Sequence, residues 1–334
     1  MTNSALYNDC NISACIITDG ADLDKLFKAV RSCFSSCSEI VICANGKYEE
    51  VKFTFRNYSK VKVFPQVWEK DFSKARNEAM SYAKGDWVLI VDSDEELETP
   101  IKYLDESFDV IDTQIQNFVS EDKTVIEQHS NYRLFRKDKD IKFELAIHES
   151  PLPDMARKQV RALNNSGIII KHSGYLGEED IAIKSKRNTE MLLAMPDTIH
   201  RNYYLFRQYT TDQKYKEAIE LGLDLLNSEQ IDDALRACIC AMLATCYLFG
   251  YNAINEVKIM LILSIRYEPN QVYARLFLLE ELARIRDMKS KELALQQVDA
   301  IETICRLRKS KLNADILFNK EHFEKLKTQI VKWQ

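Results

Sequence analysis

The chain is 334 residues long, which is enough for two domains with ample hydrophobic cores. Apolar residues make up 46% of it and charged residues 29%, which are ordinary values for a globular protein. The formal net charge of −5 argues against a general nucleic-acid binder, because such proteins normally carry a basic excess.

The first apolar run, ACIIT, breaks at Asp19 and is too short for a signal peptide or a membrane span. We therefore expect a cytoplasmic protein. The cysteines support this expectation, because the majority of them lie in apolar runs, where reduced cysteines act as small apolar side chains. These are Cys15, Cys43, Cys238, Cys240 and Cys246. Cys33 and Cys37 form a close pair, but no second pair at zinc spacing follows, so a metal or redox role for them is not expected.

Strand and helix signals alternate over the first part of the chain. Apolar runs rich in strand formers predict strands at residues 12–18, 39–44, 60–65 and 87–92. Amphipathic spacing predicts helices at residues 23–30 and 71–83, the second with Asp71 as its N-cap. This β-α-β-β-α-β order predicts an α/β domain with a mainly parallel sheet covered by helices. Residues 111–119 and 132–137 predict a hairpin after it.

Ligands of such sheets bind beyond the carboxyl ends of the strands. Three predicted loops fall there, at residues 18–20, 44–46 and 92–94. In the third loop Asp92 and Asp94 lie on one side of an extended segment, because side chains alternate along it. Two such carboxylates favour a hard divalent cation such as Mg²⁺ or Mn²⁺, which often bridges to phosphates. The alternative is a solvated acidic turn that caps a following helix, and it also accounts for Glu95 and Glu96.

Helix signals fill the chain from about residue 195 onward. We predict one domain over residues 1–195 and a second over residues 196–334. The second is predicted to be an array of helical hairpins that echoes the tetratricopeptide pattern, with an ordinary all-α packing domain as the alternative. Because such arrays often self-associate, a homodimer through this domain is the expected assembly.

Several ordered motifs resemble the family 2 glycosyltransferases of the GT-A fold. The segments are ISACIIT, EIVICANG, WEKDFSKARNEAM, GDWVLIVDSDEE, YRLFRKDKDIKFELAIHE and KHSGY followed by KSKRNTEMLL. More narrowly, the chain is similar to a bacterial branch with a C-terminal tetratricopeptide-like domain, which includes the SunS-type bacteriocin peptide S-glycosyltransferases. The resemblance covers residues 11–195 motif by motif and the helical region in texture only. It implies inverting transfer from a nucleotide sugar, with a UDP-sugar as the expected donor, to a glycan acceptor or a peptide Cys, Ser or Thr side chain.

The resemblance also implies roles for individual residues. It assigns Asp94, Asp92 and His172 to an Mn²⁺ or Mg²⁺ ion, with Asp92 acting on the metal through water or on the ribose. It favours Glu149, with His148 as the other candidate, as the general base. The residues implied to bind the nucleotide are Thr18, Asp19, Asn45, Asp71, Arg76 and Asp92. The KSKRN cluster, expected to open the helix that joins the two domains, is implied to neutralise the diphosphate through Lys184, Lys186 and Arg187.

Each assignment has a plainer alternative. His172 also fits a satisfied histidine at a strand end, and Glu149 also fits a side chain that orients a neighbour. Asp71 and Arg76 also fit pairing on a helix surface, and the KSKRN cluster also fits a solvated helix face.

One position departs from the family pattern. An aspartate that helps to hold the base and ribose is usual where this chain has Ala44, and Asn45 next to it offers a substitute hydrogen-bonding group. Two rival functions follow from these observations. The first is a non-catalytic helical-repeat scaffold with a degenerate GT-A domain, which Ala44 supports. The second is a sugar-phosphate nucleotidyltransferase, which usually has a Gly-rich phosphate loop where this chain reads TDGADLDK.

Overall fold

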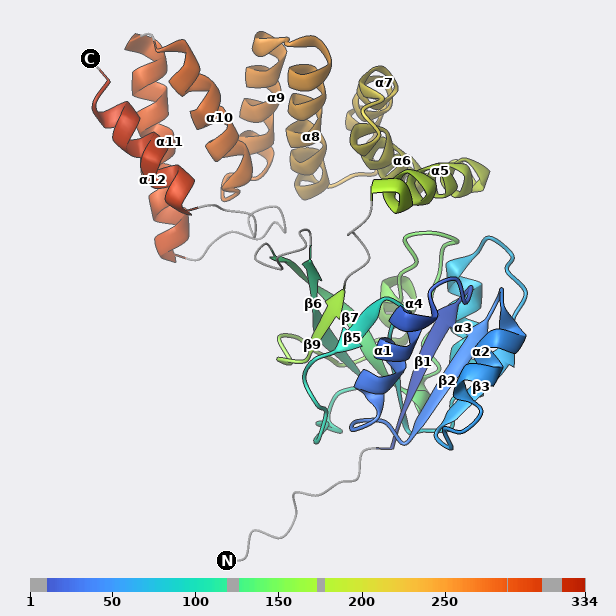
Figure 1. Cartoon of the computed structure of the whole chain (residues 1–334). Helices are drawn as coiled ribbons and strands as arrows, with labels where there is room; N and C mark the ends of the chain where they lie inside the picture. The colour runs from blue at the N-terminus through green and yellow to red at the C-terminus, as the bar shows by residue number, and fades with distance from the viewer. Residues whose placement is uncertain (1–10, 119–125, 173–177, 287, 308–319, 334) are drawn as a thin grey trace, which may run out of the picture. The chain divides into compact units, whose positions relative to one another are not determined.

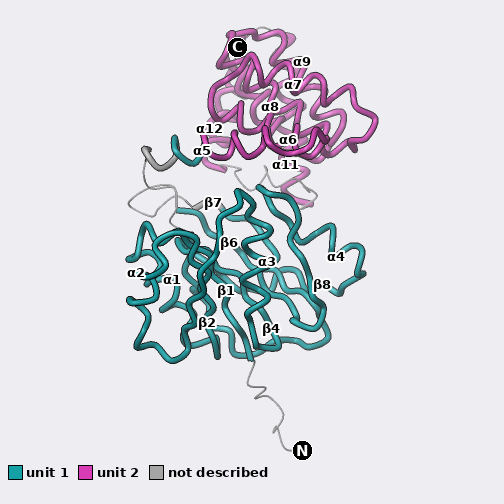
Figure 2. The backbone as a smooth tube through the Cα atoms, turned by 90° about the vertical axis from the view of Figure 1, so that its right-hand side faces the viewer, with its two compact units in different colours: residues 1–184 teal, residues 185–334 magenta. Residues whose placement is uncertain are grey.

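The computed structural model describes residues 11–118, 126–172, 178–286, 288–307 and 320–333 (Figure 1). The chain divides into two compact units, residues 1–184 and 185–334 (Figure 2). The division falls inside the helix α5 (Glu178–Ala194), before the boundary predicted at residue 195, which stays a prediction. The tasks assigned to the two parts stay predictions.

One mixed sheet forms the centre of the first unit. Its strand order is β3-β2-β1-β4-β7-β6-β9-β5, with β8 beside β6. The parallel part consists of β3 (Val61–Pro65), β2 (Glu39–Ala44), β1 (Ile12–Thr18) and β4 (Trp87–Ile90). The remaining strands are β5 (Glu95–Leu97), β6 (Val110–Phe118), β7 (Ile126–Arg136), β8 (Ala162–Leu163) and β9 (Ile169–His172). The predicted α/β fold is confirmed, and the antiparallel pairs β4–β7, β6–β7 and β5–β9 make the sheet mixed.

Helices cover both faces of the parallel strands (Figure 1). On one face α1 (Leu23–Cys33) and α2 (Tyr48–Phe55) bury Leu26 and Phe55 against Ile40 and Ile42 of β2. On the other face α3 (Phe72–Tyr82) buries Ala79 and Met80 against Val41 and Cys43. Since strand side chains alternate between faces, β2 supplies both cores.

The predicted order omitted α2, and that was wrong. Val51 and Phe55 are its only fully buried side chains, one turn apart. Two apolar positions give too weak a helical pattern, and the β-branched and aromatic residues between them favour a strand. The predicted hairpin is confirmed as the antiparallel pair β6–β7.

The described residues of the second unit are helical, as predicted. The helices are α6 (Ile199–Thr211), α7 (Tyr215–Leu226), α8 (Asp233–Tyr251), α9 (Ile254–Tyr267), α10 (Tyr273–Ile285), α11 (Met288–Leu307) and α12 (Lys320–Val331). Among the described helices, α8 alone has the length and apolar composition of a membrane span. Its side chains Ile239 and Leu243 belong to one core cluster and Ala244 to the next, so α8 acts as the central core helix of this unit.

Candidate functional site

The loops that follow β1 and β2 are joined through their backbones. Asn45 N donates to Thr18 O at 2.8 Å, and Lys47 N donates to Asp19 O at 2.9 Å. The approach is so close that a Cβ on Gly46 would lie 2.0 Å from Asp19 O, which explains the glycine. The structure therefore brings together Thr18, Asp19 and Asn45, and their contact with a nucleotide base stays a prediction.

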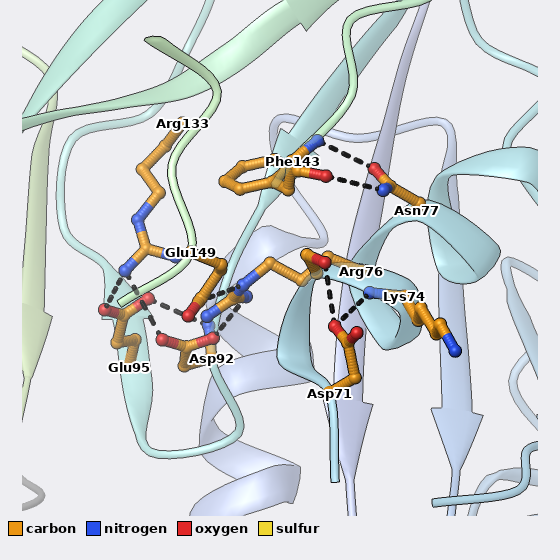
Figure 3. Close-up of polar contacts among 10 residues, drawn as sticks. Asp71, Lys74, Arg76, Asn77, Asp92, Glu95, Arg133, Phe143 and Glu149 are labelled. Carbon is orange, nitrogen blue, oxygen red and sulfur yellow. Dashed lines mark hydrogen bonds and ion pairs between the residues drawn. The ribbon is translucent and has the colours of Figure 1, made fainter. Parts of the chain in front are cut away.

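Asp71 acts as the N-cap of α3, as predicted from the sequence. Its Oδ1 accepts hydrogen bonds from Lys74 N at 2.9 Å and from the Ser73 hydroxyl at 2.7 Å (Figure 3). The cap fixes the first turn of the helix that carries Arg76. A role of Asp71 in nucleotide binding stays a prediction.

Asp92 lies between two buried arginines. Arg76 Nη1 donates to Asp92 Oδ1 at 2.7 Å, and Arg133 Nη2 donates to Oδ2 at 3.3 Å (Figure 3). Burial by itself raises the pKa of Asp92, but the charges of Arg76 and Arg133 outweigh it and hold this pKa well below its usual range. Burial by itself lowers the pKa of Arg76, but the carboxylates of Asp92 and Glu149 outweigh it and raise this pKa above its usual value. Asp92 is therefore a permanently charged anchor for both guanidinium groups.

Glu149 is presented by a short strained loop. The loop is closed by Glu144 and Ser150, whose backbone groups exchange two hydrogen bonds of 3.0 Å. Within it, Leu145 (φ 77°) and His148 (φ 53°) adopt the left-handed backbone conformation, which costs of order 1–3 kcal/mol at a residue other than glycine. Arg76 Nε donates to Glu149 Oε1 at 2.7 Å, so the predicted base and the predicted nucleotide-binding arginine are in direct contact.

Two further contacts fasten this loop to α3. Phe72 N donates to Ala146 O at 2.8 Å. The side chain of Asn77 exchanges two hydrogen bonds of 2.9 Å with the backbone of Phe143 (Figure 3). Because Arg76 lies on the same helix, the loop and the arginine are positioned together.

Asp94 has a different set of neighbours. Its Oδ2 lies 3.4 Å from His172 Nε2 and 3.7 Å from Lys184 Nζ. In the sheet, His172 is paired with Glu95 of β5 and with Asn117 of β6, which explains how β9 brings the histidine to the loop after β4. His172 Nδ1 and Asn117 Oδ1 are 2.8 Å apart.

The pKa values of this pair move in opposite directions. Burial raises the pKa of Asp94, but the hydrogen bond and charge of His172 outweigh it, and the pKa is lowered. Burial lowers the pKa of His172, but the hydrogen bond and charge of Asp94 outweigh it, and the pKa is raised. Each partner therefore favours the charged form of the other.

The donor set at Asp94 fits a divalent metal ion that also binds a diphosphate. Among the described residues, no three His, Cys, Asp or Glu side chains are grouped as a complete metal site. An ion that keeps waters and shares phosphate oxygens needs only one or two protein ligands, and Asp94 and His172 supply a carboxylate and an imidazole. With its Nδ1–H donated to Asn117, a neutral His172 presents Nε2 as the ligand atom. Both oxygens of Asp92 face arginines, so its action on a metal through water stays a prediction.

Two residues of the site, Glu95 and Arg133, were not predicted to belong to it. Glu95 is only 2% exposed, and its Oε1 accepts from Arg133 Nη2 at 3.1 Å. The solvated acidic turn considered for Glu95 is therefore wrong, and the segment begins the strand β5 rather than a helix. No signal of this burial was present in the sequence, because Glu95 and Glu96 are identical acids and only the structure shows that Glu95 and Leu97 are buried and Glu96 exposed. Arg133 gave no such signal, because its position depends on the tertiary structure.

The KSKRN cluster lies within α5 and does not open it, because the helix begins at Glu178. Lys184 reaches Asp94, as described above. Lys186 and Arg187 are exposed and belong to the second unit. Their contact with a diphosphate stays a prediction.

Comparison with known proteins finds a family model and relatives that match parts of this chain. Residues 15–175 match the sequence model of glycosyl transferase family 2. The SPbeta prophage-derived glycosyltransferase SunS of Bacillus subtilis (strain 168) is 25% identical over 253 residues, which cover 70% of this chain and 58% of SunS. A TPR repeat-containing protein of Synechococcus elongatus is 28% identical over 148 residues, covering 41% of this chain and 34% of that protein. This chain thus spans little more than half the length of SunS.

Solved structures with a partial likeness include S. aureus TarS 1–349 in complex with UDP. It has a TM-score of 0.42 at 15% identity and covers 78% of this chain and 92% of that one. GalNAc-T7 with UDP, GalNAc and Mn²⁺ has a TM-score of 0.37 at 12% identity, covering 50% and 44% of the two chains. The assignment rests on the family match and on the parallel strands, the hairpin and the acidic loop described above. The part of the chain that matches glycosyl transferase family 2 is therefore residues 15–175, which lie within the first unit.

Proposed function

We propose that this chain is a metal-dependent, inverting glycosyltransferase that moves a sugar from a nucleotide sugar to an acceptor nucleophile. The observation that carries the proposal is the pairing of two sites in a family 2 domain. Asp94, His172 and Lys184 form a group suited to a metal ion and a diphosphate. Glu149, held by Arg76, supplies a carboxylate suited to a general base.

The leaving group requires positive charge. A divalent ion held by Asp94 and His172 would neutralise the charge that develops on the departing nucleoside diphosphate. Lys184, 3.7 Å from Asp94, adds a protein cation on the same side. A role of Lys186 and Arg187 in binding the diphosphate is proposed from the sequence resemblance alone.

The acceptor requires a base. As the acceptor oxygen or sulfur attacks the anomeric carbon, its proton passes to the carboxylate of Glu149 and the bond from that carbon to the diphosphate oxygen breaks. Attack on the face opposite the leaving group inverts the anomeric configuration. Arg76 fixes the rotamer of Glu149, and His148, the preceding residue in the strained loop, remains the second candidate.

For the donor we propose a UDP-sugar, with the joined loops at Thr18 and Asn45 next to the base. For the acceptor we propose a peptide Cys, Ser or Thr side chain or a glycan, held by the helical unit, which is also the proposed dimerisation unit. The peptide acceptor is proposed from the resemblance to the SunS-type branch, and SunS itself is 25% identical over 70% of this chain. The paired Asp94–His172 and Arg76–Glu149 contacts favour an enzyme over a degenerate scaffold.

The test is turnover of UDP-, GDP- and TDP-sugars with Mn²⁺ or Mg²⁺, comparing wild type with Asp94→Ala. Asp86→Ala, which removes an exposed carboxylate at the opposite end of β4, is the matched control. We expect metal-dependent release of the nucleoside diphosphate from wild type and the control only. Release of pyrophosphate would indicate nucleotidyl transfer instead, and the absence of metal-dependent turnover with every donor would favour the scaffold.

A further inference from the structure

Arg133 lies at a β-bulge between β6 and β7. Leu134 is paired with Ile111 and Tyr132 with Asp112, which leaves Arg133 as the extra residue. The bulge also explains why Tyr132 and Phe135 pack against the same core cluster, since residues three apart on a regular strand face opposite sides. Bulges of this kind redirect a side chain, and here the redirected side chain is an arginine that points at the loop after β4 (Figure 3).

Glu95 and Arg133 together hold Asp92. Arg133 Nη2 lies 3.1 Å from Glu95 Oε1 and 3.3 Å from Asp92 Oδ2. The other oxygen of Glu95 accepts the backbone N–H of Asp92 at 2.8 Å. Glu95 therefore accepts a hydrogen bond from the main chain of Asp92, and Arg133 donates one to its side chain. Both residues are more than nine-tenths buried.

The contacts continue without a break to the proposed base. From Asp92 the chain of ion pairs passes to Arg76 at 2.7 Å and from Arg76 to Glu149 at 2.7 Å. Resting on the proposed function, we infer that Arg133 and Glu95 are positioning residues. Through Asp92 they fix the orientation of Arg76, and through Arg76 they set the direction in which the Glu149 carboxylate faces the acceptor.

The energetics of buried ion pairs favour this role over one in stability. Two charges taken out of water gain little net stability, and an apolar pair of similar size usually replaces them without loss. Arg133 Nε adds to the cost, because it is buried and makes no hydrogen bond among the described residues. The geometry of Asp92, which no apolar pair reproduces, is what these charges provide.

The experiment separates positioning from folding with a double variant. Arg133→Met alone leaves the charge of Glu95 buried and unpaired, so both the melting temperature and kcat are expected to fall. Arg133→Met with Glu95→Gln removes both charges and keeps an acceptor for Asp92 N. We expect the melting temperature to recover while kcat stays about 100-fold below wild type, as for other small misplacements of catalytic groups. KM for the donor should change much less, and Arg133→Lys should retain an intermediate kcat.

The matched control is the ion pair of Arg161 with Asp109, another buried acid of the same unit that lies outside the chain of contacts. Arg161→Met with Asp109→Asn should leave kcat unchanged. Recovery of kcat together with the melting temperature in the Arg133–Glu95 double variant would overturn the inference, as would a loss confined to KM.

A second readout needs no turnover. The Nε–H of Arg76, which donates to Glu149, gives a side-chain signal in ¹⁵N NMR of the free protein. We expect this signal to shift and to exchange faster in the double variant but not in the control, and an unchanged signal would overturn the inference. If wild type turns over no sugar nucleotide, the proposed function fails while this measurement still tests the positioning of Arg76.

Discussion

Asp92 and Asp94 are separated by one residue, yet they have different neighbours, and we propose different tasks for them. Asp92 is held by two arginines that do not lose their charge, and it faces the loop that carries Glu149. Asp94 faces His172 and Lys184. We propose that a metal ion takes the place of these contacts when the diphosphate binds. Two aspartates in an Asp-x-Asp sequence therefore need not bind the same ligand, because the contacts of each carboxylate depend on the strand or helix that faces it.

The largest effect on kcat is expected at Glu149, which is linked to Asp92 through Arg76. Glu149→Gln keeps a hydrogen-bond acceptor for Arg76 but cannot take a proton at neutral pH. We expect kcat to fall about 10³-fold, within the range for loss of a general base, with little change in the melting temperature. His148→Gln is the comparison variant, and an equal or larger loss there would transfer the role of base to His148.

The two aspartates should differ in how much each contributes to the free energy of unfolding. Asp92→Ala leaves Arg76 with Glu149 and Arg133 with Glu95, but it removes one charge-assisted hydrogen bond from each buried arginine. At about 1.5–3 kcal/mol for each such bond, we expect the free energy of unfolding to fall by about 3–5 kcal/mol. Asp94→Ala removes a partly exposed carboxylate from a histidine and a lysine, and we expect a loss of about 1 kcal/mol or less. Urea unfolding in EDTA measures both. Equal losses would contradict the division between an anchoring and a metal-binding aspartate.

Metal affinity should depend on Asn117, which contacts His172 next to Asp94. Asn117→Ala removes the acceptor that fixes the His172 ring, and loss of such a partner typically weakens metal binding about 10- to 100-fold. Titration of Mn²⁺ in the presence of UDP, followed by electron paramagnetic resonance, measures the change. The control Asn77→Ala removes an amide that holds the loop carrying Glu149, so it should lower kcat and leave Mn²⁺ affinity unchanged.

Much of this arrangement follows from local sequence. The strand β4 and the acids after it, the N-cap Asp71 and the hairpin β6–β7 were predicted, because apolar alternation and capping act over a few residues. The bulge at Arg133 could not be predicted, since it depends on the register of two strands. The burial of Glu95 depends on that same arginine, and the sequence alone presents it as one more acid in a charged turn.

The two sides should also differ in their response to pH, with the smallest effect of the set. The folded pKa of His172 is raised above its unfolded value of about 6.5, so its contribution to stability is complete below pH 6.5 and is lost as pH rises through the folded pKa. The folded pKa of Asp94 is lowered, so its contribution is present above about pH 4 and is lost only in acid. The Asp94–His172 pair therefore stabilises the metal-free protein between these limits and weakens above them, whereas the arginine pairs of Asp92 keep their charge at alkaline pH. In EDTA we expect wild type to lose a small part of its unfolding free energy between pH 6 and pH 9, and His172→Gln to lose less over the same range. If both lose the same amount, the charged pair is absent from the free protein, and His172 does not account for the lowered pKa of Asp94.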